Sequence, residues 1–490
     1  MAWNPDFEAA FRPRTVAVVG ATRKPVLFGD FVGTLVQAGF PGQIYPINPR
    51  AAEAGESIHG YRAYASLREV PERIDLVTAS VPAKDIIPML EDCTAVDAKN
   101  IQIYTAGFRE SGTEEGERLE SELQRVARKG GLRIVGPNCM GLHVPAARCT
   151  TWPTLEAPGP VGFIAQSGGH AGVFIVEAAN YGINVSKVIS FGNAAVMDST
   201  DFLEYMAGDA ETEIICMYVE GVKDGPKLTS LVREINREKP VIIWKGGATD
   251  SGARAAASHT GSLGGEREVW DAFFRQTGAI RVDCMEELLN AAMTFRYLRP
   301  LAGRRVALIL GGGGNSVAAA DVCDRAGLEV PHFSEKTQSE LLSFIPSEGT
   351  ISRNPIDIAF AMVDLNLLMR SIEASAADPS IDAVIFALPP GAILIAANLL
   401  QAKEGCTFEE ALERQTQLTI DSLAYFNRAN EYGKPLVIVL HPGLVRFLPG
   451  QKDKLLQALL SKGVPVYLSI EQASLAIGRF IRYHEFHGKA

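Results

Sequence analysis

TVAVVGATRKP (Thr15–Pro25) decides the fold: a short run of small and β-branched apolar residues is followed by Gly20 and a polar turn. Apolar runs of this length are typical of strands buried on both faces, and therefore of a parallel sheet. Two further stretches begin in the same way, PVGFIAQSGGHAG (Pro160–Gly172) and RVALILGGGGNS (Arg305–Ser316). The recurrence predicts three α/β units, each with a glycine-rich turn that leads from a strand into a helix.

More short apolar runs follow each of these starts. They are IDLVTASVP and NIQIYTAGF, then VSKVISFGN, EIICMYVEG and PVIIWKGG, then IDAVIFALPP and KPLVIVLHP. Their alternation with helical patterns predicts parallel sheets joined by right-handed crossovers. Turn-rich connectors at 144–160 and 296–305 separate the three groups. We therefore expect domains at residues 1–145, 158–298 and 303–490.

Composition excludes several classes of protein. The chain has 490 residues, 47% of them hydrophobic and 21% charged, and a formal net charge of −10. A negative net charge argues against a broad nucleic-acid surface, and we find no apolar run long enough to span a membrane. The first residues lack the pattern of a signal peptide, so we expect a cytoplasmic protein. The seven cysteines are scattered without a CxxC pair, which argues against a zinc site, and we expect reduced, mostly buried thiols.

The glycine-rich turns are candidate anion sites. A turn that opens a helix after a buried strand exposes backbone N–H groups, and the helix dipole favours an anion there. Close packing of strand on helix is the alternative for any one turn. Ser167 in IAQSGG also suggests the nucleophile of an α/β hydrolase, but Ala165 stands where that GxSxG pattern has its first glycine. We favour phosphate contacts at this turn over a nucleophilic serine.

One histidine lies in a stretch rich in small residues, KGGATDSGARAAASHTGSLGG (Lys245–Gly265). The neutral imidazole of His259 suits phosphoryl transfer because it titrates near neutral pH and is a nucleophile. Its second nitrogen needs a partner, and Glu220, at the end of the strand predicted in EIICMYVEG, is a candidate because a buried acid is costly without a role. A solvated loop histidine is the alternative interpretation.

The segment SHTGSLGG (Ser258–Gly265) closely resembles the phosphohistidine loop of the NDP-forming acyl-CoA synthetases, which include ADP-forming acetate–CoA ligases and the succinyl-CoA synthetase alpha subunit. The resemblance covers most of the chain in an ordered series of blocks. The blocks that resemble the family's CoA-binding domain are VAVVGATRKP, GQIYPINPR, SVPAKD, YTAGF and IVGPNCMGL. Those that resemble the second domain are IAQSGG, SFGN and YVEG. Those that resemble the third domain of the ADP-forming branch are GGGGNSVAAAD and SRNPIDI. The implied fold is a Rossmann-like CoA-binding domain followed by two flavodoxin-like parallel α/β domains.

The resemblance also assigns roles to individual residues. It implies that His259 carries the phosphoryl group and that Glu220 holds its imidazole. It implies a phosphate site made by Ser167, Gly168, Gly169, Gly192 and Asn193. For coenzyme A it implies contacts from Gly20, Ala21, Thr22, Arg23 and Lys24, from Asn48, Pro49 and Arg50, from Pro82, Ala83 and Lys84, from Thr105, Ala106, Gly107 and Phe108, and from Asn138.

The implied reaction is the reversible joining of a carboxylic acid to coenzyme A at the expense of ATP or GTP, through an acyl phosphate and phosphohistidine. ATP or ADP and Mg²⁺ would be held mainly by an ATP-grasp beta subunit or domain, which we do not recognise in this chain, and no metal ligand is nominated here. We expect a homo- or hetero-oligomer. Two alternatives stay open: a regulatory CoA-binding protein of the same fold, and a lyase or transferase that acts through an acyl-CoA. A nicotinamide dehydrogenase is disfavoured because the GxGxxG turn is missing.

Two positions depart from the family pattern. Gly264 replaces the usual alanine of SHTGSLAG, a small change. His170 follows Ser167-Gly168-Gly169 where many relatives have an aliphatic residue. It is either a packed or capping histidine or a residue that faces the acyl pocket, so neither acetate nor succinate is assumed as the substrate.

Overall fold

A computed structural model describes residues 5–22, 24, 29–154, 156–252, 254, 267–346, 350–358, 363–440 and 448–488. The chain divides into two compact units, Met1–Ala179 with Ile183–Leu288, and Asn180–Gly182 with Leu289–Ala490. Among the described residues, the first unit contains two large sheets and one two-stranded hairpin, and the second unit contains one sheet. Among the described residues, no helix combines the length and the apolar character that crossing a membrane requires.

The first sheet is parallel throughout, in the order β2-β1-β5-β6-β7. Strands β2 and β5 lie on opposite sides of β1, so the chain changes direction across the sheet there. Ligands of open α/β sheets bind outside the carboxyl ends of the strands at such a reversal. The strands are β1 (Thr15–Val19), β2 (Gln43–Ile47), β5 (Leu76–Ala79), β6 (Asn100–Ile103) and β7 (Arg133–Val135), with helices α2 (Phe31–Ala38), α3 (Pro49–Glu53), α4 (Ala83–Ala95) and α5 (Glu114–Gly130) and a small hairpin, β3 (Ser57–Ile58) with β4 (Tyr61–Arg62).

The second sheet has the order β14-β13-β12-β10-β11-β8-β9, and its strand order reverses at β10. Its first five strands are parallel, whereas β8 runs antiparallel to β11 and β9 antiparallel to β8. This antiparallel edge was not indicated by the sequence pattern: β8 comes from the end of the first predicted domain and β9 from within the predicted connector at 144–160. The strands are β8 (Gly141–Val144), β9 (Cys149–Thr150), β10 (Pro158–Ala165), β11 (Val185–Ser190), β12 (Ile214–Val219), β13 (Val241–Lys245) and β14 (Ile280–Val282), with helices α1 (Pro5–Phe11), α6 (Gly168–Asn180), α7 (Ser199–Gly208), α8 (Gly225–Ile235) and α10 (Arg267–Thr277) in the same unit.

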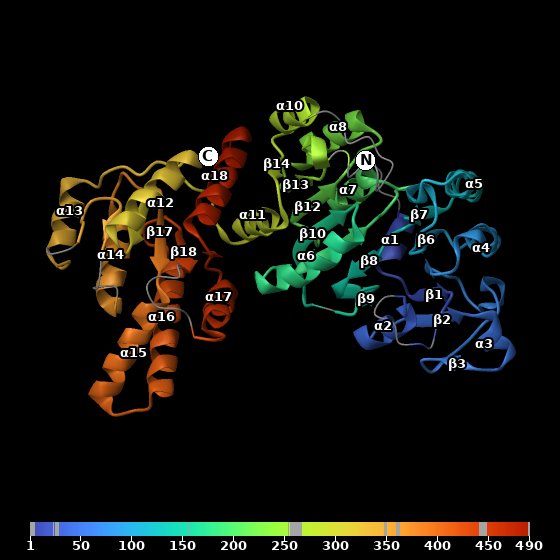
Figure 1. The fold of residues 1–490 in the computed structure, drawn as a ribbon, viewed down its shortest axis with the longest axis horizontal. Coiled ribbons are helices and arrows are strands. Elements are labelled where there is room, and N and C mark those ends of the chain that lie inside the picture. The colour runs from blue at the N-terminus through green and yellow to red at the C-terminus, as the bar shows by residue number, and fades with distance from the viewer. Residues whose placement is uncertain are drawn as a thin grey trace. The chain divides into compact units, whose positions relative to one another are not determined.

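The third sheet, in the second unit, is parallel in the order β16-β15-β17-β18-β19. Helices α15 and α16 form an antiparallel pair joined by a short turn (Figure 1). The bounds are β15 (Val306–Leu310), β16 (Ile356–Asp357), β17 (Ala383–Leu388), β18 (Leu436–Leu440) and β19 (Val466–Tyr467), with α12 (Gly313–Arg325), α13 (Glu335–Leu342), α14 (Leu365–Ala377), α15 (Pro390–Glu404), α16 (Phe408–Ala429), α17 (Gln451–Ser461) and α18 (Ile470–Phe486); α11 (Met285–Tyr297) spans the division between the units. The predicted α/β fold class is confirmed, and the domain boundaries stay a prediction.

Helix starts follow from local chemistry. The side chain of Asp30 accepts a hydrogen bond from the N–H of Gly33 and begins α2, and Thr113 caps α5 in the same way. Asp198 and Thr407 each form a reciprocal capping box, with Asp201 and Glu410 respectively. Each cap satisfies N–H groups that have no acceptor within the helix.

Lys187 is a charged residue in the middle of a buried strand. Its side chain is fully buried in β11, and Nζ donates to Asp209 at 2.7 Å and to Glu211 at 2.8 Å. Burial acts to raise the pKa of Asp209, but hydrogen bonds from Lys187 and Thr212 outweigh it, so the pKa lies below its usual value. The ion pair explains how a lysine is tolerated in a parallel-sheet interior, where an unpaired charge would be expelled.

We expect Lys187→Met to destabilise the first unit by about 3 kcal/mol, because it leaves the Asp209 carboxylate largely buried without its cation. Urea denaturation measures this loss. Because the pKa of folded Asp209 is depressed, the pair stabilises the fold above the usual carboxyl range. The difference between Lys187→Met and the wild type should therefore shrink as pH falls through that range.

Arg118→Ala is the control, since Arg118 and its partner Glu115 are both exposed and the change should leave the urea midpoint unaltered. Equal midpoints for Lys187→Met and the wild type would contradict the assignment.

Candidate functional site

A cavity of about 770 Å³ in the first unit is lined by residues from both of its sheets. It includes seven residues singled out from the sequence: Ala106, Asn138, Ser167, Gly168, Gly169, Gly192 and Asn193. The remaining lining residues are Tyr104, Cys139, Met140, Trp152, Pro153, Thr154, Gln166, Gly172, Val173, Val176 and Glu177. The volume lies within the range of roughly 300–1,000 Å³ that small-molecule sites occupy.

The turns predicted to contact coenzyme A meet at the carboxyl edge of the first sheet. Gly20 directly follows β1 and has φ +83°, and a Cβ there would lie 2.4 Å from the carbonyl oxygen of Ser80, so only glycine fits. Asn48 Nδ2 donates to the carbonyl oxygen of Ala21 at 2.9 Å, while its Oδ1 caps α3. The turns after β1, β2 and β5 are thus fastened together at the point where strand order reverses.

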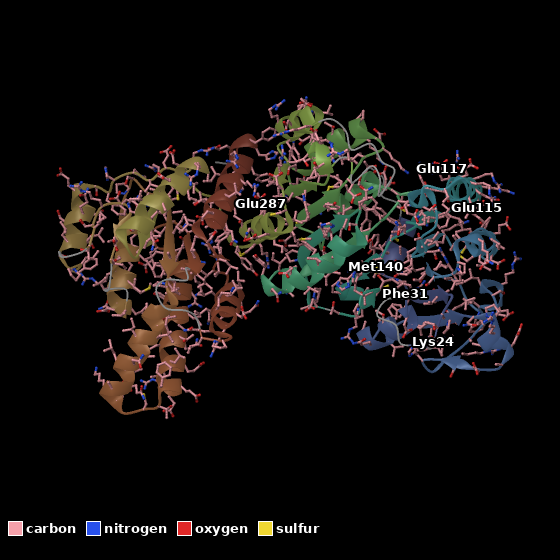
Figure 2. All side chains as sticks on the ribbon, viewed as in Figure 1. Lys24, Phe31, Glu115, Glu117, Met140 and Glu287 are labelled. Atoms are coloured by element: carbon pink, nitrogen blue, oxygen red, sulfur yellow. The ribbon has the colours of Figure 1, made fainter. Side chains whose placement is uncertain are left out.

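Cationic side chains stand at this edge. Lys24, Arg50 and Lys84 are all exposed, and Figure 2 labels Lys24 in the turn that follows Gly20. Thr22 Oγ1 accepts from the N–H of Lys24 at 3.1 Å. Pro49 and Ala83 open α3 and α4, next to Pro82. Arg23 lies outside the described residues.

The segment Thr105–Phe108 follows β6 and is held from within the protein. Thr105 Oγ1 donates to the carbonyl oxygen of Val81 at 2.6 Å, and the N–H groups of Gly107 and Phe108 donate to Glu110. The Phe108 side chain is fully buried in the core of the first sheet, so only its backbone lies at the edge. Burial in the core explains the aromatic residue at this position, and the coenzyme A contact predicted for Thr105–Phe108 stays a prediction.

The two sheets of the first unit meet at Asn138 and Gly192. A Cβ on Gly192 would lie 2.2 Å from the Asn138 carbonyl oxygen and 2.4 Å from that of Pro137. Asn193 donates its N–H to Pro137 at 3.0 Å, and its side chain bonds Asn138 and Glu120. The polar groups of Asn193 therefore join the sheets, while Asn193 and Gly192 also form part of the cavity wall.

The turn after β10 opens α6 into the cavity. The Ser167 hydroxyl oxygen accepts from the N–H of His170 at 3.3 Å, as a helix cap does. A Cβ on Gly168 would lie 2.8 Å from Met140, which Figure 2 labels, so this position must be small. The first-turn N–H groups of α6 have no acceptor within the helix, and the helix dipole adds partial positive charge beside them. This arrangement suits an anion.

Glu220 follows β12, the strand beside β10, and is buried. Its Oε1 accepts a hydrogen bond from the Tyr218 hydroxyl at 3.1 Å. Gln166 Oε1 accepts the N–H groups of Glu220 at 2.8 Å and Gly221 at 3.2 Å. Because Gln166 also lines the cavity, the anion turn and the buried carboxylate are tied to one another at the reversal of the second sheet.

His170 packs in an aromatic cluster. Its ring stacks on Tyr218 with centroids 4.3 Å apart and meets Trp244 edge-on at 4.7 Å. Burial lowers the pKa of His170, an effect that the Glu220 charge partly offsets. Of the two sequence interpretations, the structure favours the packed histidine. It also weakens the hydrolase alternative, since the Ser167 hydroxyl caps a helix and the His170 ring packs on Tyr218.

His259 lies outside the described residues, and the residues before it can be placed. Lys245 ends β13 in register with Val219, the residue before Glu220. The Lys245 side chain is buried, and burial lowers its pKa while the Glu220 charge acts in the opposite direction. The segment that carries His259 therefore leaves the sheet beside Glu220.

Sequence reasoning missed several residues of the cavity wall. Trp152 and Pro153 lie in a connector interpreted as a domain boundary, and Gly172, Val173 and Val176 lie on α6 beyond the turn. A tryptophan within a turn-rich connector was the available signal. Cys139 also lines the cavity, but burial raises its pKa to about 12, so it is a thiol and not a nucleophile.

Among the described residues, no group of three or more His, Cys, Asp or Glu side chains is arranged to hold a metal ion. The described site offers backbone N–H groups at a helix start, a buried carboxylate and a partly apolar cavity. Chemically it can bind an anion and orient a group that needs a carboxylate partner.

Comparison with known proteins gives two domain matches and close full-length relatives. A CoA binding domain model matches residues 14–145, and a succinyl-CoA ligase like flavodoxin domain model matches residues 158–295. The acetate–CoA ligase (ADP-forming) II subunit alpha of Pyrococcus furiosus is 35% identical over 95% of this chain and 95% of that one. The longer acetate–CoA ligase (ADP-forming) I of Archaeoglobus fulgidus is 36% identical over 83% of this chain and 58% of its own length. A solved Ca. Korarchaeum cryptofilum dinucleotide forming acetyl-coenzyme A synthetase 1, in complex with phosphate and ADP, superposes with a TM-score of 0.81 at 27% identity, covering 99% of this chain and 98% of that one.

Gly192→Ala should force the two sheets of the first unit apart, because the added Cβ would collide with backbone oxygens of Pro137 and Asn138. We expect a loss of about 3 kcal/mol or more in the free energy of unfolding, from the steric clash and from the positive φ of 54°. Urea denaturation measures it. Gly208→Ala is the matched control, since a Cβ there meets nothing within 4 Å. Equal stability of the two variants would contradict the proposed junction.

Proposed function

The chain belongs to the family of ADP-forming acyl-CoA synthetases, and from that premise we propose that it is an alpha-type component in which phospho-His259 is formed. The reaction is carboxylic acid + CoA + ATP ⇌ acyl-CoA + ADP + phosphate. The relatives named above are ADP-forming, which favours adenine over guanine nucleotides.

One observation carries the proposal. A single cavity is bounded by Tyr104, Ala106 and Asn138 from the edge of the first sheet and by the Ser167–Gly169 turn from the second. Coenzyme A at the first edge and phosphate at the second would then meet in one cavity. Holding two reactants in that geometry replaces a bimolecular encounter with an oriented one.

In the first step, phosphate attacks the thioester carbonyl, the C–S bond breaks, and acyl phosphate and CoA thiol are the products. The start of α6 fits the phosphate because Gly168 and Gly169 carry no side chain that would block approach to the N–H groups. The fixed helix dipole stabilises negative charge there without rearrangement. Ser167, Gly192 and Asn193 complete our proposed phosphate site.

In the second step, the neutral imidazole of His259 attacks phosphorus, the bond to the acyl oxygen breaks, and the carboxylate leaves. The imidazole N–H needs an acceptor, and Glu220 is proposed for that role. A buried carboxylate fixed by Tyr218 and Gln166 would hold one tautomer and stabilise the imidazolium charge that develops. The same residues act in reverse order when the thioester is made.

Coenzyme A is proposed to bind along the carboxyl edge of the first sheet. Gly20 lets the backbone approach a ligand closely, and Gly107, with φ +104°, does the same after β6. Lys24, Arg50 and Lys84 are exposed there and would pair with the phosphate groups. The other residues that we propose to contact coenzyme A are Ala21, Thr22, Arg23, Asn48, Pro49, Pro82, Ala83, Thr105, Ala106, the Phe108 backbone and Asn138.

The nucleotide is proposed to bind on an ATP-grasp subunit or domain, with Mg²⁺ at its phosphates. The support is that relatives of equal length are subunits, whereas single-chain relatives are longer. Phospho-His259 would then pass its phosphoryl group to ADP on that partner.

We expect His259→Asn to abolish labelling of the chain by radioactive ATP and Mg²⁺ in the presence of a co-produced ATP-grasp partner, because the only proposed acceptor nitrogen is gone. Base-stable, acid-labile label on the wild type is the reference. His332→Asn, an exposed histidine in the second unit, is the control and should label normally. Label retained on His259→Asn would refute the assignment.

Tyr218→Phe should slow phosphorylation of the chain about tenfold while preserving the fold, because the carboxylate of Glu220 loses its neutral donor without a change in side-chain shape. Rapid-quench labelling measures the rate. Tyr297→Phe also removes a tyrosine hydrogen bond, to the Gly182 carbonyl oxygen, but in the second unit. A labelling rate for Tyr218→Phe equal to that for Tyr297→Phe would show that Tyr218 does not position Glu220.

A further inference from the structure

Glu110 joins two segments that belong to different sheets of the first unit. It lies in a single turn of 3-10 helix (Arg109–Ser111), just beyond the turn that follows β6. Its Oε1 accepts hydrogen bonds from the N–H of Gly107 at 2.6 Å and from that of Phe108 at 3.2 Å. Its Oε2 accepts a hydrogen bond from Nδ2 of Asn193, which follows β11 of the second sheet. The two oxygens of one carboxylate therefore connect the edge of the first sheet with the turn after β11.

Both hydrogens of the Asn193 amide are used within the protein. Besides the bond to Glu110, Asn193 Nδ2 donates to Oε2 of Glu120 at 3.1 Å. Its Oδ1 accepts from Nδ2 of Asn138 at 3.3 Å. An ionised carboxylate accepts hydrogen bonds and cannot donate them, so the two glutamates fix the direction in which the Asn193 amide points.

The two glutamates differ in burial. The side chain of Glu120, on α5, is 2% exposed, and Nε of Arg109 lies 3.4 Å from its Oε1. Glu110 is only partly buried and belongs to the short helix next to Gly107. Glu120 is therefore a fixed anchor for Asn193, whereas Glu110 transmits to Asn193 any displacement of the turn after β6.

Both ends of this bridge reach the cavity wall. Ala106, the neighbour of Gly107, lines the cavity, and so does Asn193. Asn138 is a third lining residue, and it donates its side-chain amide to Asn193 and its backbone N–H to the Thr105 carbonyl oxygen at 3.0 Å. The polar contacts thus run without interruption from the segment proposed to bind coenzyme A to the turn proposed to bind phosphate.

We propose that Glu110 is a positioning residue that couples the binding of coenzyme A to the binding of phosphate. The inference rests on the proposed function, because it takes coenzyme A at Thr105–Phe108 and phosphate at Gly192 and Asn193 as given. A ligand that holds the first segment also holds the Glu110 carboxylate, and with it the Asn193 amide. The bridge is fixed once for both ligands, so the second ligand binds with a smaller loss of conformational freedom. Each ligand should strengthen the binding of the other by the same factor.

Titration calorimetry on the complex of the full chain with its ATP-grasp partner measures this coupling. Coenzyme A is titrated with and without saturating inorganic phosphate at matched ionic strength, and no reaction follows because neither an acyl group nor a nucleotide is present. We expect the dissociation constant of coenzyme A to fall about fivefold when phosphate is present. A dissociation constant that phosphate leaves unchanged or raises would overturn the proposal.

Glu110→Gln separates the two ends of the bridge. The glutamine oxygen can still accept from Gly107 and Phe108, but its amide nitrogen would face Asn193 Nδ2, which places a donor opposite a donor. The measured quantity is the ratio of the dissociation constants without and with phosphate, and we expect it to fall from about five to about one. A ratio in Glu110→Gln equal to that of the wild type would contradict the role of Glu110.

Glu117→Gln is the matched control. It makes the same chemical change at an exposed position of α5, which Figure 2 labels, and should keep the wild-type ratio. Loss of the ratio in this variant as well would show that the effect is not specific to Glu110.

Asn193→Ala cuts the bridge from the side of the second sheet. It should lower the ratio as far as Glu110→Gln does, and the double variant should lower it no further, because both changes remove one connection. A further fall in the double variant would refute a shared connection. Urea midpoints identify any variant that fails to fold, and the ratios of the wild type and of the remaining variants then decide the question.

Failure of this inference is distinguishable from failure of the proposed function. If coenzyme A binds and radioactive ATP labels His259, but phosphate does not strengthen the binding of coenzyme A, only the role of Glu110 fails. If coenzyme A does not bind and no label forms, the proposed function fails.

Discussion

The backbone contact between Gly192 and Asn138 is the constraint on which the site depends. Carbonyl oxygens of Pro137 and Asn138 lie where any side chain at position 192 would begin, so the two sheets of the first unit approach with no room to spare. Asn193 adds hydrogen bonds to Pro137 and Asn138 across the same junction. Each sheet alone has only an open carboxyl edge. Joined here, the two edges bound one cavity that neither could form by itself.

Within that cavity the electrostatic character comes from backbone more than from side chains. The described lining holds no cationic side chain, yet the start of α6 presents N–H groups and the positive end of a helix dipole. Such a site stabilises an anion by dipoles that are already oriented, so little reorganisation energy is needed when the anion binds. It also leaves the rest of the described cavity wall free to carry apolar side chains such as Met140 and Val173.

The buried charged groups of this unit are held by defined partners. Glu220 accepts from Tyr218, and the N–H of Glu220 donates to Gln166, so both the carboxylate and its backbone are fixed. Lys187 is held between Asp209 and Glu211. The first arrangement lies at the site and the second lies within the strand interior. Burial alone therefore does not identify a functional charge, and the role proposed for Glu220 is supported by its position at the reversal of strand order.

Much of the fold follows from local sequence. Runs such as TVAVV and VALIL are buried along their whole length, and Gly20 adopts a positive φ that glycine allows, so these strands and turns are encoded by residues close together in the chain. The turn at Ser167–Gly169 and the strand that ends at Glu220 could be identified for the same reason. The resemblance to a family then supplied roles for these residues that spacing alone could not.

Only the tertiary structure decided which of these pieces meet. Strands β8 and β9 join the second sheet, Trp152 of a connector lies against Gly172, and the Tyr218 hydroxyl donates to Glu220. Each of these contacts depends on packing or strand pairing between separate segments. His170 and Phe108 show the same limit, since a residue near a ligand turn can equally be packed in an aromatic cluster or a core. Sequence by itself determined the strands, the turns and the kinds of chemistry available. The cavity, its apolar wall and the partner of each polar group were decided by long-range contacts, because local propensity carries no information about which surfaces are brought together.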